Sequence, residues 1–230
     1  MAGIRTTCGK AILSWVVGMA LAPAGGPAQG QEPPAIDPLA STAVLDLRSD
    51  PDPDRRKEAA AALATIGSPA AIQALQSALS SDPDPRVREA AAGALGQLGP
   101  LARGVTPSLV HALNDTESLG PEDRGTVCSA AAEALGALGR DALDAVGPLA
   151  RAGNGECGGD NSPALAALSL LASELSRISS SLPSSALQEA LEDFGEAEET
   201  LGPAFPAEAG QALGEVRREI RSRRLGRFAP

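Results

Sequence analysis

The stretch DPDPRVREAAAGALGQLG, residues 82–99, decides the fold. Its Asp-Pro pairs also occur at residues 50–53, and an alanine-rich run follows each copy. Proline suits the first turn of a helix, and aspartate accepts hydrogen bonds from the free amides of that turn. Ala91, Leu95 and Leu98 then recur at four- and three-residue spacing before a closing glycine. The stretch therefore predicts an amphipathic helix with a defined beginning and end.

This helix is one copy of an internal repeat. Four copies of its apolar ending are visible, with the pairs Leu63 and Ile66, Leu95 and Leu98, Leu135 and Leu138, and Leu168 and Leu171. A second apolar helix is expected after the first in each of the first three copies. A single hairpin of this size cannot bury its apolar face, so neighbouring hairpins must stack. We expect an all-α solenoid of stacked antiparallel helical hairpins over residues 38–180, with a less regular helical C-terminal cap over residues 181–230.

The two Asp-Pro units, which begin at residues 50 and 82, resemble the HEAT-like repeat family, including the type found in phycobilin lyases. The resemblance implies a ladder between units, formed by an aspartate before each first helix and an arginine in its first turn. The matching residues here are Asp50, Asp82, Arg56 and Arg88.

The third unit departs from this pattern at a cysteine. Cys128 occupies the position of the ladder arginines, and Cys157 lies just before the first helix of the fourth unit. Both thiols are expected at the same end of neighbouring helices. We predict a Cys128–Cys157 disulfide where the charged ladder fails; two free thiols are the alternative.

Residues 1–28 are typical of a signal peptide. Arg5 and Lys10 precede an apolar run at residues 11–22, and small residues follow it. A membrane anchor is the alternative, although the run is well short of the ~20 residues that a helix needs to span a bilayer. We therefore predict a short linker at residues 29–37 and an exported, periplasmic or extracellular protein.

Composition argues against several kinds of chemistry. The chain has one histidine and no tyrosine, with one tryptophan and three phenylalanines. It therefore lacks the residues for a multi-histidine metal site or for base stacking, and we expect no cofactor, no metal and no enzymatic activity. Residues 31–216 carry 11 positive and 28 negative side chains, which would repel nucleic acid.

These features predict a non-catalytic scaffold that binds a protein through the concave face of its second helices. The residues expected to face that groove are Gln73, Ser77, Ser108, His111 and Arg151. An accessory protein or lyase-like enzyme acting on a chromophore or small ligand is an alternative that the phycobilin-lyase resemblance allows. A structural spacer without a partner is another.

The C-terminal end is basic, in contrast to the acidic body. Its arginines are Arg217, Arg218, Arg221, Arg223, Arg224 and Arg227. We interpret the helix that carries them as a cap on the last repeat, because arginine suits the negative end of a helix dipole. A tether to an anionic surface is the alternative.

Overall fold

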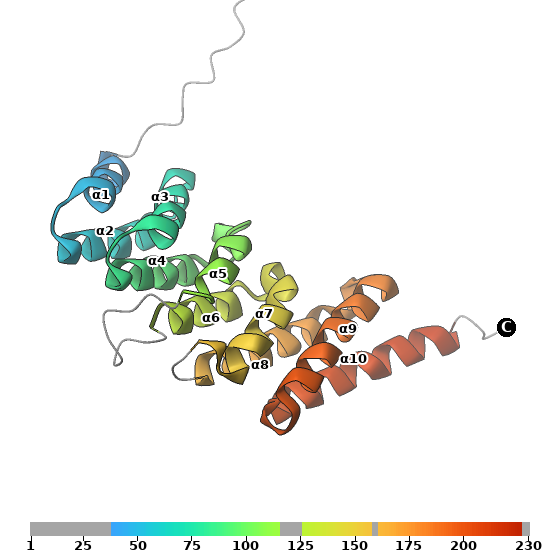
Figure 1. Cartoon of the computed structure of the whole chain (residues 1–230). Helices are drawn as coiled ribbons and strands as arrows, with labels where there is room; N and C mark the ends of the chain where they lie inside the picture. The colour runs from blue at the N-terminus through green and yellow to red at the C-terminus, as the bar shows by residue number, and fades with distance from the viewer. Residues whose placement is uncertain (1–37, 116–125, 158–160, 227–230) are drawn as a thin grey trace, which may run out of the picture. The chain divides into compact units, whose positions relative to one another are not determined.

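The computed structural model describes residues 38–115, 126–157 and 161–226, which belong to one compact unit of the chain, Ile36–Pro230. Every regular element in these ranges is helical (Figure 1). The α-helices are α1 (Pro38–Ser49), α2 (Pro53–Ile66), α3 (Pro69–Ser81), α4 (Pro85–Leu98), α5 (Thr106–Ala112), α6 (Thr126–Leu138), α7 (Val146–Arg151), α8 (Ser162–Ile178), α9 (Ser184–Leu201) and α10 (Ala207–Gly226). The predicted signal peptide and linker, residues 1–37, lie outside the described residues.

Aspartate side chains start the first helices of the two most regular units. Asp52 Oδ1 accepts a hydrogen bond from the amide of Asp54 at 3.0 Å, and Asp84 Oδ1 accepts one from the amide of Arg86 at 2.9 Å. A proline occupies the first turn in both helices. Because such a cap contributes about 1 kcal/mol, the repeated Asp-Pro pairs fix where α2 and α4 begin.

The helices form two layers. In the first layer α2, α4, α6, α8 and α10 pack side by side in chain order (Figure 1). In the second layer α1 packs on α3, α3 on α5, and α7 on α9. The 3-10 segment η2 (Gly139–Ala145), which leads into α7, packs on α5 and so continues the layer between them. This arrangement confirms the all-α solenoid of stacked hairpins.

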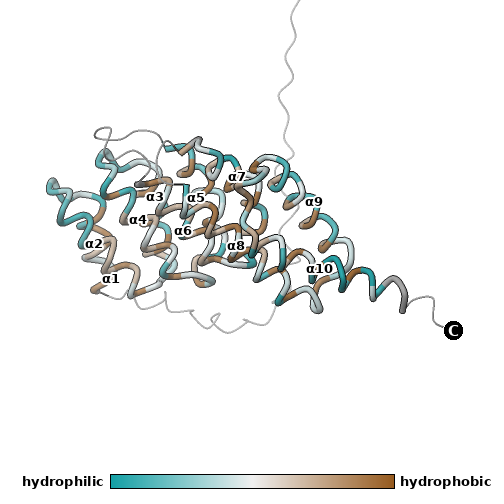
Figure 2. The backbone as a smooth tube through the Cα atoms, turned by 90° about the horizontal axis from the view of Figure 1, so that it is seen from below, coloured by the Kyte–Doolittle hydropathy of each residue, from teal (hydrophilic) through white to brown (hydrophobic). Residues whose placement is uncertain are grey.

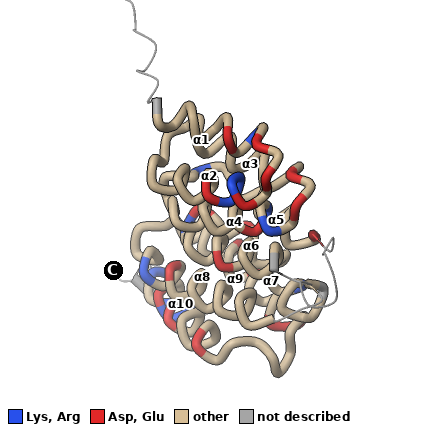
Figure 3. The backbone as a smooth tube through the Cα atoms, turned by 90° about the vertical axis from the view of Figure 1, so that its left-hand side faces the viewer, with Lys and Arg blue, Asp and Glu red and all other residues tan. Residues whose placement is uncertain are grey.

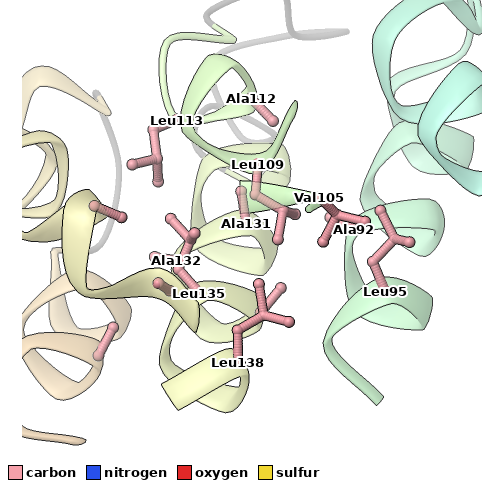
Figure 4. Packing of buried hydrophobic residues seen from close by; sticks show 14 of the residues in the cluster. Ala92, Leu95, Val105, Leu109, Ala112, Leu113, Ala131, Ala132, Leu135 and Leu138 are labelled. Carbon is pink, nitrogen blue, oxygen red and sulfur yellow. The ribbon is translucent and has the colours of Figure 1, made fainter. Parts of the chain in front are cut away.

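Alanine and leucine fill the space between the layers. Leu63, Leu95, Leu135 and Leu168, the equivalent leucines of the four units, are all 0% exposed. Figure 4 shows how side chains from α4, α5 and α6 meet in this core, and Figure 2 shows apolar and polar residues alternating along the helices. Burying one such leucine contributes about 1.5–3 kcal/mol, so the repeated leucines hold each hairpin to its neighbours.

Two glycines let first helices approach closely. A Cβ placed on Gly96 of α4 would lie 2.8 Å from the Cα of Ala134 on α6. The corresponding Cβ on Gly136 of α6 would lie 3.1 Å from the Cα of Ala167 on α8. Because both contacts are with backbone, a side chain at either glycine would push the helices apart.

The C-terminal helices continue both layers: α9 packs on α7, and α10 packs on α8. Phe194 of α9 is completely buried, and α10 buries one stripe formed by Ala209, Leu213, Val216 and Ile220. Residues 184–226 therefore join the stack through the same kind of packing as the preceding helices.

Candidate interaction surfaces

An arginine and an aspartate form a buried ion pair between the first two units. Arg56 lies on α2, and Asp82 follows α3. Arg56 Nε donates to Asp82 Oδ2 at 2.8 Å, and Nη2 donates to Oδ1 at 2.9 Å. The hydrogen bond to Asp82 raises the pKa of the Arg56 guanidinium above its ordinary value. A third donor, Nη1, binds the carbonyl oxygen of Asp50 at 3.0 Å, so the arginine joins the start of its own unit to the start of the next.

The next unit repeats this geometry one step along the stack. Arg88 of α4 donates from Nε to Asp115 Oδ2 at 2.7 Å and from Nη2 to Oδ1 at 3.2 Å. Its Nη1 donates to the carbonyl oxygen of Asp82 at 2.9 Å. Both side chains of this pair are largely buried. Asp82 therefore accepts from Arg56 through its carboxylate and from Arg88 through its backbone.

The third rung is covalent. Cys128 of α6, at the position of Arg56 and Arg88, forms a disulfide with Cys157, and their Cα atoms lie 5.9 Å apart. Both cysteines are buried. The π-helical turn η3 (Ala152–Glu156) leads into Cys157, just as α3 leads into Asp82. The structure thus contains the pairing predicted from the repeat register, and it shows that the disulfide stands in the place of an ion pair.

Three rungs of this kind form a column along one edge of the stack, which we call the rung column: Arg56–Asp82, Arg88–Asp115 and Cys128–Cys157. Acidic and basic residues gather around α2 to α5, the helices that carry or flank the first two rungs (Figure 3). The partner of Arg88 was missed in the sequence, because no Asp-Pro pair marks Asp115. The spacing could have revealed it: the rung partners lie 26, 27 and 29 residues apart.

Asp50 stands at the beginning of this column. Its Oδ1 accepts from the amide of Asp52 at 2.8 Å, and its Oδ2 lies 3.9 Å from Arg55. The carboxylate thus contacts its own unit, whereas Asp82 and Asp115 bind an arginine of the preceding first helix. In the described residues no first helix precedes α2.

A polar hollow of about 440 Å³ opens beside the second rung. The ends of α3 and α5 line it, with Asp82, Arg88 and Asp115 among its walls and His111 beside them. The guanidinium and both carboxylates already form the ion pairs described above. The charged walls of the hollow are therefore engaged in interactions within the chain.

The five residues expected to face a partner all reach the surface of the second-helix layer. Gln73 and Ser77 are exposed one turn apart on α3; on α5, His111 is exposed and Ser108 is half-buried. Arg151 is exposed at the end of α7. We call these five residues the second-helix face. The structure places them in one layer, and their role in binding stays a prediction.

The C-terminal arginines differ in what they contact. Arg223 donates from Nη1 to the carbonyl oxygen of Leu182 and from Nη2 to that of Ser179, both at 2.7 Å. Its Nε also donates to Glu219 at 2.8 Å. Arg223 therefore joins α10 to the end of α8, as expected for a cap.

The other arginines are more exposed. Arg217 lies 3.7 Å from Glu198 of α9, while Arg218 and Arg221 reach solvent. The side chains of Arg224 and Arg227 lie outside the described residues.

A groove of about 760 Å³ runs between α1 and α2. Carboxylates and small apolar residues line it. No sequence motif marked this surface, which lies on a side of α2 that none of the described first helices covers.

Within the described residues, no group of three or more histidine, cysteine or carboxylate side chains is arranged to hold a metal ion. The same part of the chain contains no helix with the length and hydropathy needed to cross a membrane.

Comparison with known proteins agrees with the fold. The family model of HEAT repeats matches residues 41–119, a segment that includes α2 to α5. A search of the curated proteins found no match. The match and the stacked hairpins together show HEAT-like repeats, whereas the likeness to the phycobilin-lyase type remains a resemblance.

Proposed function

We propose that this chain, which carries HEAT repeats, is an exported, non-catalytic scaffold that binds another protein through its second-helix face. HEAT repeats generally mediate protein–protein interactions. The observation that supports the proposal best is the position of polar side chains at corresponding surface sites of α3, α5 and α7. A surface spread over several helices suits a macromolecule better than a small ligand.

Two features support export and the absence of catalysis. The Cys128–Cys157 disulfide is of the kind that persists in oxidising compartments, which fits the leader-like residues 1–28. His111 is the single histidine of the chain, and it is exposed, far from the buried setting in which a general base is usually tuned.

Site-specific photo-crosslinking tests the binding surface. A benzophenone amino acid is placed at Ser77 or at His111 of the full chain in its native cell, and crosslinked products are identified by mass spectrometry. The matched control carries the same group at Glu133, which is exposed on α6 of the first layer. We expect Ser77 and His111 to capture the same protein and Glu133 not to.

Other outcomes would contradict the proposal. Capture of the same protein from Glu133 would show that the second-helix face is not specific. Purified protein that carries a chromophore would favour the ligand-handling alternative, and full-length protein retained inside the cell would contradict export.

A further inference from the structure

The outer face of α2 is built like an internal face of the stack. Ala94, Ala134 and Ala167, which occupy equivalent positions on α4, α6 and α8, are 3%, 2% and 1% exposed. Ala134 lies against Gly96 of the preceding first helix, and Ala167 lies against Gly136 in the same way. Ala62, the equivalent residue of α2, is exposed. The pattern that elsewhere receives a neighbouring helix is thus present on α2 and uncovered by any described element.

This face forms the floor of the groove between α1 and α2. The apolar residues that line it are Leu39, Ala43, Ala59, Ala62 and Ile66. Five carboxylates, Asp46, Asp50, Asp52, Asp54 and Glu58, also line the groove, with Arg55 as the one basic residue among its described walls. An apolar floor beside several carboxylates favours an occupant with an apolar stripe and positive charge.

Asp50 indicates where a positive charge of the occupant would bind. Asp82 and Asp115, its equivalents, each bind two nitrogens of an arginine from the preceding first helix. A helix that packed on Ala62 as α2 packs on α4 would bring its own first-turn residue to Asp50. A guanidinium there would complete the rung column at its open end.

We propose that the α1–α2 groove is a docking site for a basic amphipathic α-helix of a partner protein. Small residues of that helix pack on Ala62 and Ile66, and one arginine binds the Asp50 carboxylate. The charge of the groove selects against acidic helices, and the shape of its floor selects for small side chains. This site is separate from the second-helix face, so either surface can fail its test without the other.

A synthetic peptide provides the test. The peptide has 18 residues, is acetylated and amidated at its ends, and carries a fluorescent label. Its sequence follows that of α2, so an arginine equivalent to Arg56, the rung arginine, is followed eight residues later by an alanine equivalent to Ala64. Lysines replace the acidic residues of that sequence. Binding to the full chain is measured by fluorescence anisotropy at several salt concentrations.

Matched variants identify the site. Ala62→Arg should weaken binding about tenfold or more by blocking the floor, whereas Ala61→Arg, at an exposed neighbour outside the groove, should change it less than about twofold. Asp50→Asn removes the charge of the carboxylate but keeps an oxygen that can accept the hydrogen bond from the Asp52 amide. Asp144→Asn removes one negative charge at an exposed position elsewhere and is the matched control.

A double-mutant cycle identifies the rung. Asp50→Asn is combined with a peptide whose rung arginine is glutamine, and we expect a coupling of about fivefold between the two changes. Independent effects, equal losses for Ala61→Arg and Ala62→Arg, or no binding of the peptide would overturn the proposal.

A photoreactive residue at position 62 distinguishes the occupants. Crosslinking to the added peptide supports the proposal. Crosslinking instead to residues 1–37 of the same chain, or to a second copy in a dimer that Ala62→Arg dissociates, would overturn it.

Discussion

The segment from α2 to α5 and the segment from α6 to α10 pack in the same two layers, but different interactions secure them. In the first segment aspartate side chains cap α2 and α4, and two arginine–aspartate pairs join successive units. In the second segment α8 and α9 begin without a side-chain cap. A disulfide and the Arg223 contacts join the helices there.

This difference shows that an ion pair and a disulfide can occupy equivalent positions of the rung column. A buried guanidinium–carboxylate pair and a disulfide both join the first helix of one unit to the start of the next. The two links respond to different conditions. The stability that an ion pair contributes depends on its charged partner and on pH, whereas a disulfide is broken by a reducing potential. The two segments should therefore be separable by experiment.

Removing one partner of a buried ion pair should have the largest effect. Arg56→Ala leaves the Asp82 carboxylate buried without its guanidinium, and we expect unfolding free energy to fall by about 3–5 kcal/mol in urea titration. The control Arg56→Met with Asp82→Asn removes both charges and should recover a large part of the loss. A single variant as stable as the wild type would mean that the first rung does not secure the stack.

Breaking the covalent rung should destabilise the second segment by about 3–4 kcal/mol, given the 29-residue separation of the cysteines. Thermal unfolding with and without reductant measures this effect. The Cys128→Ala, Cys157→Ala double variant should match the reduced wild type and be insensitive to reductant. Two alkylatable thiols in protein isolated from its native cells without reductant would show that the bond is absent there.

The sequence predicted the parts of the fold that depend on local signals. Repeated Asp-Pro pairs and spaced leucines were sufficient to identify the stacked hairpins. The register of Cys128 against Arg56 and Arg88 was sufficient to indicate its partner. These predictions succeeded because each rests on the same position in several repeats.

Contacts without such a repeated signal were not predicted. Asp115 has no following proline to mark it as the partner of Arg88. Arg223 reaches the carbonyl oxygen of Leu182, 41 residues away, through the packing of α10 on α8. The groove between α1 and α2 lies on a face of α2 that none of the described first helices covers, and no repeated sequence signal marks it.

Two glycines on α4 distinguish the effect of the α4–α6 contact on stability from the effect of helix propensity. This contact joins the first segment to the second. Gly96→Ala forces a Cβ to 2.8 Å from the backbone of Ala134, so we expect a loss of about 1–3 kcal/mol. Gly93→Ala meets nothing within 4 Å and should instead stabilise α4 by about 0.5–1 kcal/mol. Equal effects of the two substitutions in urea titration would contradict the close approach of α4 and α6.

Substitution of Arg223 tests whether its hydrogen bonds to Leu182 and Ser179 hold α10 on the stack. Arg223→Ala removes donors to two carbonyl oxygens, and we expect a loss of about 1–2 kcal/mol in thermal unfolding. Arg221→Ala, at an exposed position on the same helix, should stay within about 0.5 kcal/mol of the wild type. If instead both variants keep their stability and lose salt-sensitive binding to anionic vesicles, the basic helix is a tether rather than a cap.

The smallest expected changes in the free energy of unfolding come from single carboxylates, whose contribution depends on pH and differs in sign between the two segments. At the start of α4, the hydrogen bond from Arg86 lowers the pKa of Asp84. The ionised carboxylate therefore stabilises the fold at neutral pH, and this contribution is lost as the pH falls through the lowered pKa. Asp84→Asn should cost about 0.5 kcal/mol at pH 7, and the difference should disappear in strong acid. Asparagine can still cap the helix, so the substitution reports mainly on charge.

Asp193 of α9 should respond with the opposite sign. Burial, followed by the charges of Glu189 and Glu196, raises the pKa of Asp193, so its ionised form destabilises the fold. Below the ordinary aspartate pKa the carboxyl is protonated in both folded and unfolded chains, and the penalty is absent; it develops fully as pH rises through the raised pKa. Asp193→Asn should therefore stabilise the chain by about 0.5 kcal/mol at pH 7 and by nothing in strong acid, as measured by urea titration across pH. A loss of stability at pH 7 would show that the carboxylate is held by a favourable contact, and the two segments would then share one response to acid.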